Sequence, residues 1–167
     1  MIRKICLLMI FALGVFYAAG QSSPYTISTN ANSVKSSTYT VKWNEFHRRL
    51  EYRDAAGKLT EYSKWNDFHN RLEYFNSKGT LIRYVKHNDF HERDETFDAA
   101  GHLESYTKYN DFHKREDYFD AKGHLMGYSK WDHFYNRENF YDAKGRLTGY
   151  RKWDDFHQRF EFTPVVR

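Results

Sequence analysis

Aromatic, acidic and imidazole side chains recur together along this chain, around an Asn or Asp, in a pattern that could bind a ligand. In Trp65-Asn66-Asp67-Phe68-His69, flat rings stand beside a carboxylate. This combination suits a sugar, which offers an apolar ring face and hydroxyl groups. Regular spacing favours a polymer, because many weak contacts act together. The candidate ligand-binding residues are Trp43, His47, Trp65, Asp67, His69, His91, Tyr109, His113, Trp131, Trp153, Asp155 and His157.

The same aromatic residues could instead hold each hairpin together. Cross-strand pairs of large side chains are the common use of such residues in a sheet. The two interpretations differ in what they predict for the tryptophan rings, which would be solvent-exposed in the first case and packed in the second.

The histidines could also bind a metal ion. Segments such as Asp67-Phe68-His69 place a carboxylate and an imidazole on one side of an extended chain. A zinc site needs three or four ligands at about 2 Å, and each copy supplies two. The histidine of the next copy would be about 10 Å away. We therefore expect no metal site and no cofactor.

An arginine recurs after each aromatic segment and could capture phosphate or carboxylate groups. An acidic residue two positions later neutralises most of these arginines, and Asn139 breaks that series. An ion pair with this acid and a stack on a ring such as Tyr62 are the simpler interpretation. The arginines are Arg49, Arg71, Arg93, Arg115, Arg137 and Arg159.

The sequence contains no P-loop, HExxH, GxGxxG or nucleophile-elbow motif. Nearly identical copies of a segment also give nearly identical environments, whereas an active site needs one specially tuned environment. We therefore predict that the chain is not an enzyme.

These residues belong to a 22-residue sequence repeat that occurs about five and a half times along the chain. Each copy contains a turn such as Asp142-Ala-Lys-Gly145, in which Asp bonds its own backbone and Gly supplies a positive φ. About eight residues rich in Tyr, Phe and Thr separate successive turns, which is typical of strands. The unit is predicted to be a β-hairpin. The turn glycines are Gly57, Gly79, Gly101, Gly123 and Gly145.

The second turn of each unit is predicted to be a two-residue turn at Asn66-Asp67, with Trp65 opposite Phe68. Strand alternation then separates a packed face from a wet face. The predicted packed face carries Trp65, Phe68, Leu59 and Tyr74, and the wet face carries Lys64, His69, Tyr62, Arg71 and Glu73.

Charge predicts how the units stack. In a parallel solenoid, equivalent Lys and Arg side chains would lie about 4.8 Å apart and repel one another. In a stack of hairpins they lie about twice as far apart, near the screening length of about 8 Å. The expected fold is all-β: a repetitive antiparallel β-hairpin stack forming a single twisted or curling sheet of about eleven strands.

The N-terminus carries the signals of export. A basic opening, an apolar run from Ile5 to Ala19 and small residues before Gln21 indicate a secretory signal peptide. The only cysteine, Cys6, would leave with it. The predicted divisions are a signal peptide at 1–20, a flexible Ser/Thr/Asn-rich linker at 21–38, the hairpin repeat domain at 39–163 and a C-terminal tail at 164–167.

Composition and charge narrow the partners. The formal net charge of +4 falls by two when Arg3 and Lys4 are removed, and acids and bases are intermixed. This balance argues against nucleic-acid binding. We expect a secreted or cell-surface protein without membrane insertion after signal cleavage.

The segment Phe140–Tyr150 resembles a YD repeat of the RHS and teneurin type, through Tyr141-Asp142, Gly145, Arg146-Leu147 and Tyr150. Looser copies extend over about 39–162. The resemblance implies a secreted or cell-surface protein built from stacked β-hairpins. Tyr-Asp is intact only at 141–142, and we expect five units to be too few for the closed shell of that family.

A second resemblance is to glucan- and choline-binding cell-wall repeats, carried by Tyr118–Leu125 and Gly127–Lys130. It implies hairpin stacks that bind saccharide or choline through aromatic residues. The Arg and His columns depart from that pattern.

The sequence therefore predicts a non-catalytic binding or adhesion module for an extracellular glycan or cell-wall polymer, which it contacts through its aromatic turns. The alternative is a structural or protein–protein interaction scaffold that assembles with other protein chains through sheet edges or faces.

Overall fold

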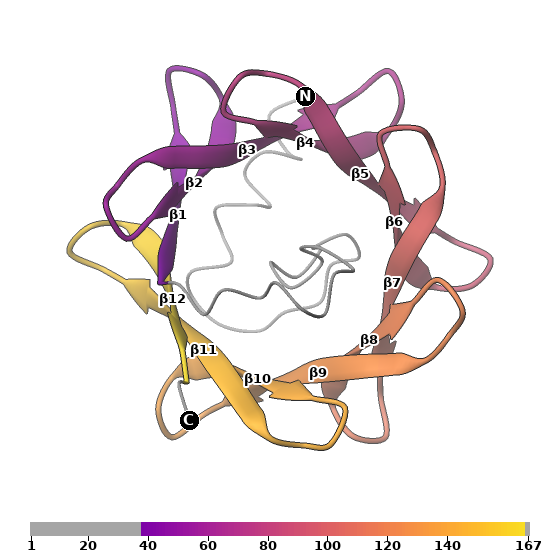
Figure 1. Ribbon diagram of the computed structural model, residues 1–167. Helices are drawn as coiled ribbons and strands as arrows, with labels where there is room; N and C mark the ends of the chain where they lie inside the picture. The colour runs from indigo at the N-terminus through magenta and orange to yellow at the C-terminus, as the bar shows by residue number, and fades with distance from the viewer. Residues whose placement is uncertain (1–37, 166–167) are drawn as a thin grey trace.

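The structure, a computed structural model, describes residues 38–165, which form twelve antiparallel β-strands closed into one barrel (Figure 1). Each strand pairs with its neighbours in sequence, and β12 pairs with β1. No helix long enough and apolar enough to span a membrane occurs among these residues. The strands are β1 (Tyr39–Asn44), β2 (Arg49–Asp54), β3 (Leu59–Asn66), β4 (Arg71–Asn76), β5 (Leu81–Asn88), β6 (Arg93–Asp98), β7 (Leu103–Asn110), β8 (Arg115–Asp120), β9 (Leu125–Asp132), β10 (Arg137–Asp142), β11 (Leu147–Asp154) and β12 (Arg159–Pro164).

The predicted all-β stack of antiparallel hairpins is confirmed, but the sheet is closed and has twelve strands instead of about eleven. The sequence left open whether the sheet curls far enough to close, and the structure shows a closed barrel. The partial copy before Gly57 supplies a complete hairpin, β1–β2, so residues 38–165 hold six hairpins. The twist of twelve strands then brings the ends together, where Tyr39 faces Phe162 and Val41 faces Phe160. The predicted signal peptide and nearly all of the predicted linker lie outside the described residues.

The connections that follow even-numbered strands are the turns that the sequence predicts, each starting with Asp or, at position 76, Asn. The side-chain oxygen Oδ1 of Asp142 accepts hydrogen bonds from the backbone N–H groups of Lys144 and Arg146, both at 2.9 Å. The five repeat glycines all have a positive φ, between 78° and 93°.

The connections that follow odd-numbered strands differ from the prediction. Asn66 pairs with Arg71 and Trp65 with Leu72, so the loop has four residues, 67–70, and the predicted partner of Trp65 is four residues out of register. The longer loop is closed by a hydrogen bond and by a backbone conformation. The N–H of His69 donates to Asn66 Oδ1 at 3.0 Å, and Asn70 takes a φ of 49°.

A shift of four residues preserves the alternation of faces, so most of the predicted division holds. Ser63, Trp65 and Tyr74 share one face, and Lys64 and Glu73 share the other. Phe68 and His69 belong to neither, because both lie in the loop. The predicted place of Leu59 beside Trp65 is also wrong, because a β-bulge shifts the register and pairs Leu59 with Arg53, on the face equivalent to that of Glu73.

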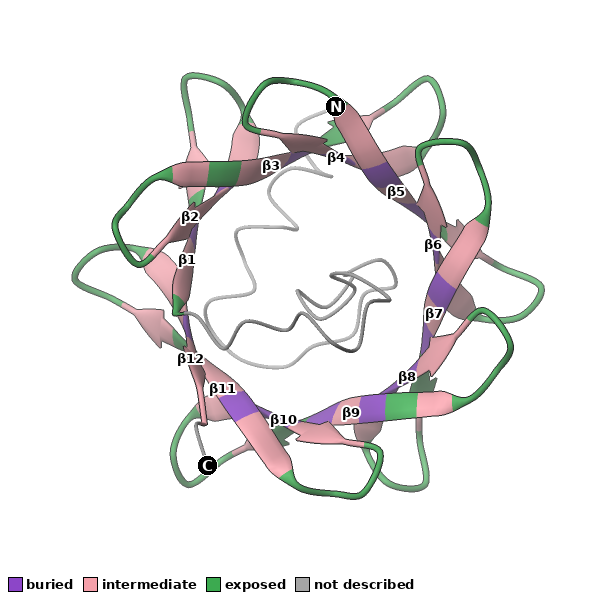
Figure 2. Cartoon of the chain, in the orientation of Figure 1, coloured by how far each residue is buried: buried purple, intermediate pink, exposed green. Residues whose placement is uncertain are grey.

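The face that carries Tyr74 is the inner face of the barrel. Phe140 and Phe162 lie two strands apart, yet their ring centroids are 5.7 Å apart, closer than the roughly 9.6 Å between alternate strands. Side chains converge in this way on the concave side of a sheet. The core cluster of Tyr118, Phe140 and Phe162, with Tyr39 packed against it, lies on this face. Figure 2 shows that burial is greatest in the middle of the strands and that the loops are exposed.

Candidate functional site

The most exposed large apolar side chains lie in the loops after the odd-numbered strands. Each loop carries a phenylalanine at its second position, and these rings are between 86% and 91% exposed. The prediction that Phe68 packs in the sheet is therefore wrong. Because every strand is antiparallel to its neighbours, these loops all lie at the same end of the barrel. We call loops 45–48, 67–70, 89–92, 111–114, 133–136 and 155–158 the loop rim; its phenylalanines are Phe46, Phe68, Phe90, Phe112, Phe134 and Phe156.

The loops hold their phenylalanine rings in a repeated geometry. In loop 67–70 the Phe68 and His69 rings form a T-shaped contact, with centroids 4.9 Å apart and planes at 86°. The last residue of each loop has a φ between 48° and 51°. These residues are Arg48, Asn70, Glu92, Lys114, Asn136 and Gln158.

The candidates His47, His69, His91, His113 and His157 all lie in the loop rim, as do Asp67 and Asp155. The loop rim contains more acids than bases. The acids are Glu45, Asp67, Asp89, Glu92, Asp111 and Asp155, against the bases Arg48 and Lys114.

The tryptophans and tyrosine of the candidate set are separated from these loop residues. They lie on the inner face, one residue before the end of each odd-numbered strand. Trp65, Tyr109 and Trp131 are 38–40% exposed, while Trp43 and Trp153 are half-buried. The Trp153 ring packs edge-on against Phe160 at 4.8 Å. The sequence grouped rings and histidines around one turn, but the structure places them on different surfaces.

The inner face carries an acidic arc that sequence reasoning missed. Asp94, Glu116 and Glu138 lie on alternate strands, β6, β8 and β10, at one level of the barrel. Burial raises the pKa of Glu116 to about 7, and the nearby carboxylates of Glu138 and Asp94 add to this effect. Glu138 accepts hydrogen bonds from Arg151 Nη2 at 2.5 Å and Ser129 Oγ at 2.6 Å. The sequence did carry a signal of this arc, because the equivalent positions in the first two hairpins are leucine and change to acids in the next three.

The repeated arginines, from Arg49 to Arg159, lie on the outer face, and most of their guanidinium groups contact acids and tyrosines of the protein itself. Arg71 Nε donates to Glu73 Oε1 at 2.8 Å, and its guanidinium lies 3.9 Å from the centroid of the Tyr84 ring. Burial alone would raise the pKa of Glu73, but hydrogen bonds from Asn66 and Arg71 lower it below its usual value. Arg49, Arg93, Arg115 and Arg137 stack on tyrosines in the same way.

The repeated stacking of arginine on tyrosine on the outer face is interrupted at the seam, where β12 pairs with β1. Thr40 stands where the other hairpins have a tyrosine, so Arg159 faces no ring there. Arg53 likewise replaces the aromatic partner of that tyrosine, as Phe75 partners Tyr62 at 5.0 Å. The missing rings leave a hollow of about 330 Å³, lined by Thr40, Arg53 and Arg159 among others.

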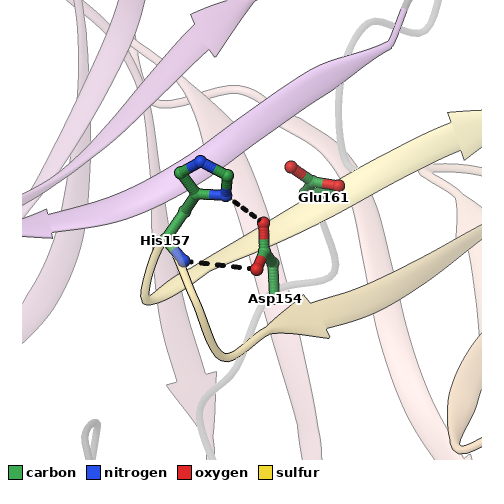
Figure 3. Close-up of side chains that lie close together, drawn as sticks. All are labelled: Asp154, His157 and Glu161. Atoms are coloured by element: carbon green, nitrogen blue, oxygen red, sulfur yellow. Dashed lines mark hydrogen bonds and ion pairs between the residues drawn. The ribbon is translucent and has the colours of Figure 1, made fainter.

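The last hairpin brings together three potential metal ligands (Figure 3). Their ligand atoms, from Asp154, His157 and Glu161, all lie within 4.8 Å of one another. His157 Nδ1 is 2.5 Å from Asp154 Oδ2. The sequence argument that each copy offers two ligands is therefore wrong for this hairpin, because it considered Asp155 and overlooked Asp154 and Glu161.

Comparison with known proteins gives a likeness of fold. No family model and no curated protein matches the chain. Among solved structures, the X-ray structure of a protein from Arabidopsis thaliana is similar, with a TM-score of 0.58 and 13% sequence identity. The match covers 77% of this chain and 79% of the other. At this level of identity the likeness concerns the fold alone.

Proposed function

We propose that this protein is a non-catalytic binding module whose loop rim engages an extracellular glycan or cell-wall polymer. The observation that carries the proposal is the set of six rim phenylalanines, each at least 86% exposed. Phenylalanine is normally among the most buried residues, and a set of exposed apolar side chains repeated at one end of the barrel is typical of an interaction surface. Packing within the barrel gives no reason for six exposed rings at equivalent positions.

The chemistry of each loop suits a sugar. The phenylalanine ring offers a flat apolar surface and lies nearly perpendicular to the ring of the next residue, which is a histidine or, in loop 133–136, Tyr135. The exposed carboxylates of Asp89 and Asp111 can accept hydrogen bonds from hydroxyl groups. Six copies around one end let weak contacts act together on a polymer or a crowded surface.

Charge narrows the ligand further. The excess of acids in the loop rim repels polyanions, so the proposal favours a neutral or amino-containing polysaccharide and disfavours nucleic acid. The location outside the cell rests on the predicted signal peptide at residues 1–20.

Closure of the sheet limits the alternative function, a scaffold that assembles with other protein chains, because it removes one of the two predicted routes of assembly. β1 and β12 pair with each other, so the described part of the chain leaves no free strand edge for assembly. An interaction scaffold would then assemble through the outer face of the barrel or through the exposed rings of the loop rim.

Polysaccharide binding of the full chain and of the triple variant Phe68→Ser, Phe90→Ser, Phe112→Ser tests the proposal. Loss of three ring contacts, each worth about 0.5–1.5 kcal/mol, should weaken binding at least about tenfold. The unfolding temperature should stay the same, because the rings are exposed.

The matched control is Lys78→Ser, Lys122→Ser, Lys144→Ser, which alters three exposed turns at the opposite end of the barrel. It should bind like the wild type. Equal binding by the phenylalanine variant would refute the proposal. Concentration-dependent dimers that only the phenylalanine variant loses, without any sugar binding, would support the scaffold instead.

A further inference from the structure

The same two positions pair with each other in successive hairpins of this chain: the last residue before the loop and the residue seven positions later. Asn44 Nδ2 donates to Glu51 Oε1 at 3.0 Å, and equivalent bonds join Asn88 to Glu95 and Asn110 to Asp117. Hairpin β9–β10 exchanges the two types, so that Asn139 Nδ2 donates to Asp132 Oδ2 at 3.0 Å. The pair always combines one amide with one carboxylate in the first five hairpins, 66/73 included.

The last hairpin breaks this rule, because Asp154 and Glu161 are both acids. Neither can donate a hydrogen bond to the other when ionised, and two like charges at this distance repel. His157 in the adjoining loop points its Nδ1 at Asp154 Oδ2. The site therefore combines one imidazole and two carboxylates, a donor set not repeated in the other described hairpins.

The seam makes this site accessible. In the other hairpins the second member of the pair faces a tyrosine on the next strand, as Glu73 faces Tyr84. Glu161 faces Thr40 instead. Its side chain is 40% exposed, whereas that of Glu73 is 12% exposed. Arg159 holds Glu161 through Oε1, with Nε at 3.0 Å and Nη2 at 2.6 Å.

We propose that Asp154, His157 and Glu161 bind one divalent transition-metal ion of the Zn²⁺ type. Zn²⁺ binds both imidazole nitrogen and carboxylate oxygen, and three protein ligands leave a fourth coordination position for water. Ligand atoms within 4.8 Å of one another need only small side-chain rotations to reach about 2 Å from a common ion. The proposal is independent of whether the loop rim binds a glycan.

The repeats supply variants that should fold. Asp154→Asn recreates the Asn–Glu pair of hairpin β1–β2, and Glu161→Asn recreates the Asp–Asn pair of hairpin β9–β10. Titration of the full chain with Zn²⁺, followed by calorimetry, should give one ion per wild-type chain at this site. Both variants should bind that ion at least tenfold more weakly. In the absence of metal their unfolding temperatures should be at least as high as that of the wild type, because each variant removes one of two like charges.

Two controls separate this site from general binding to exposed histidines and acids. Asp132→Asn removes a carboxylate at the equivalent position of a hairpin that has Tyr135 in place of His157, and His91→Ala removes a loop histidine beside an Asn–Glu pair. Both should bind Zn²⁺ like the wild type. The proposal is overturned if the wild type binds no Zn²⁺, if Asp154→Asn and Glu161→Asn bind it unchanged, or if the controls weaken it as much.

Discussion

Glu116 illustrates how one side chain acquires properties that its repeat does not predict. It lies on β8, between Asp94 on β6 and Glu138 on β10. Burial, followed by these two charges, raises its pKa from 4.5 to about 7. The folded state therefore binds a proton that the unfolded state has already released between pH 4.5 and 7. Glu116 consequently lowers stability as the pH rises through this range, and the loss is complete above pH 7.

Replacement of Glu116 by Gln should remove this penalty. The variant should be more stable than the wild type at pH 8, by an amount on the order of 3 kcal/mol, and nearly equal to it at pH 4.5. Urea unfolding at several pH values measures the difference. Glu45→Gln, at an exposed loop position, should follow the wild-type curve. A Glu116→Gln difference that does not grow between pH 4.5 and 8 would contradict the assigned pKa.

Each hairpin combines a glycine turn at one end with a strained loop at the other. Gly101 takes a φ of 93°, which glycine adopts freely, whereas Glu92 is held at a φ of 50°. A non-glycine residue in the left-handed region costs about 1 kcal/mol or more. The six loops therefore reduce the stability of the barrel while they present the phenylalanine rings.

Glu92→Gly should relieve this strain and raise the free energy of unfolding by about 1 kcal/mol. Thermal or urea unfolding measures the change. Asn70→Gly is a matched comparison and should gain less, because asparagine tolerates the left-handed region better. Gly101→Ala should move the other way and lower the stability by about 1 kcal/mol. Equal stability for all three variants would refute this account of the loops.

Closure of the barrel depends on the contacts at its seam. β1 and β12 share three paired positions, whereas β1 and β2 share six. The aromatic cluster compensates for the short ladder: Tyr39 stacks on Phe162 at 4.9 Å, and Phe162 meets Phe140. A barrel that opened here would expose two strand edges, which are templates for pairing between chains.

Phe162→Ala should therefore open the seam. Phe162 is 7% exposed, so its loss should lower the free energy of unfolding by about 3–5 kcal/mol. Amide exchange should speed up first in β1 and β12, and size-exclusion chromatography should show oligomers that grow with concentration. Phe156→Ala, which removes an exposed ring, should change neither measurement. Uniform exchange across all strands would show that the seam is not the weak point.

Much of the local architecture is readable from the residues. Asp142 and Gly145 predict a tight turn because one bonds its own backbone and the other takes a positive φ, and both do so here. The spacing of the glycines predicts hairpins of uniform length, and strand alternation correctly separates Lys64 from Tyr74. These features depend on interactions between residues near one another in the chain.

The loop after Asn66 shows where this reasoning fails. A non-glycine residue closes each such loop, and Arg48, Asn70 and Glu92 share no chemical feature that would reveal it. The predicted two-residue turn therefore placed Phe68 in the sheet. In the four-residue loop, the Phe68 ring that the sequence assigned to packing is 91% exposed.

The sequence by itself determined the hairpin, its repeat length and the pairing of arginine with acid and tyrosine, since each needs only neighbouring residues or strands. Only the tertiary structure decided that the sheet closes, that Glu116 lies between two other acids, and that Thr40 leaves Glu161 uncovered. The physical reason is that these contacts join strands distant in sequence. Their geometry depends on the accumulated twist and curvature of the whole sheet, which a single repeat does not specify.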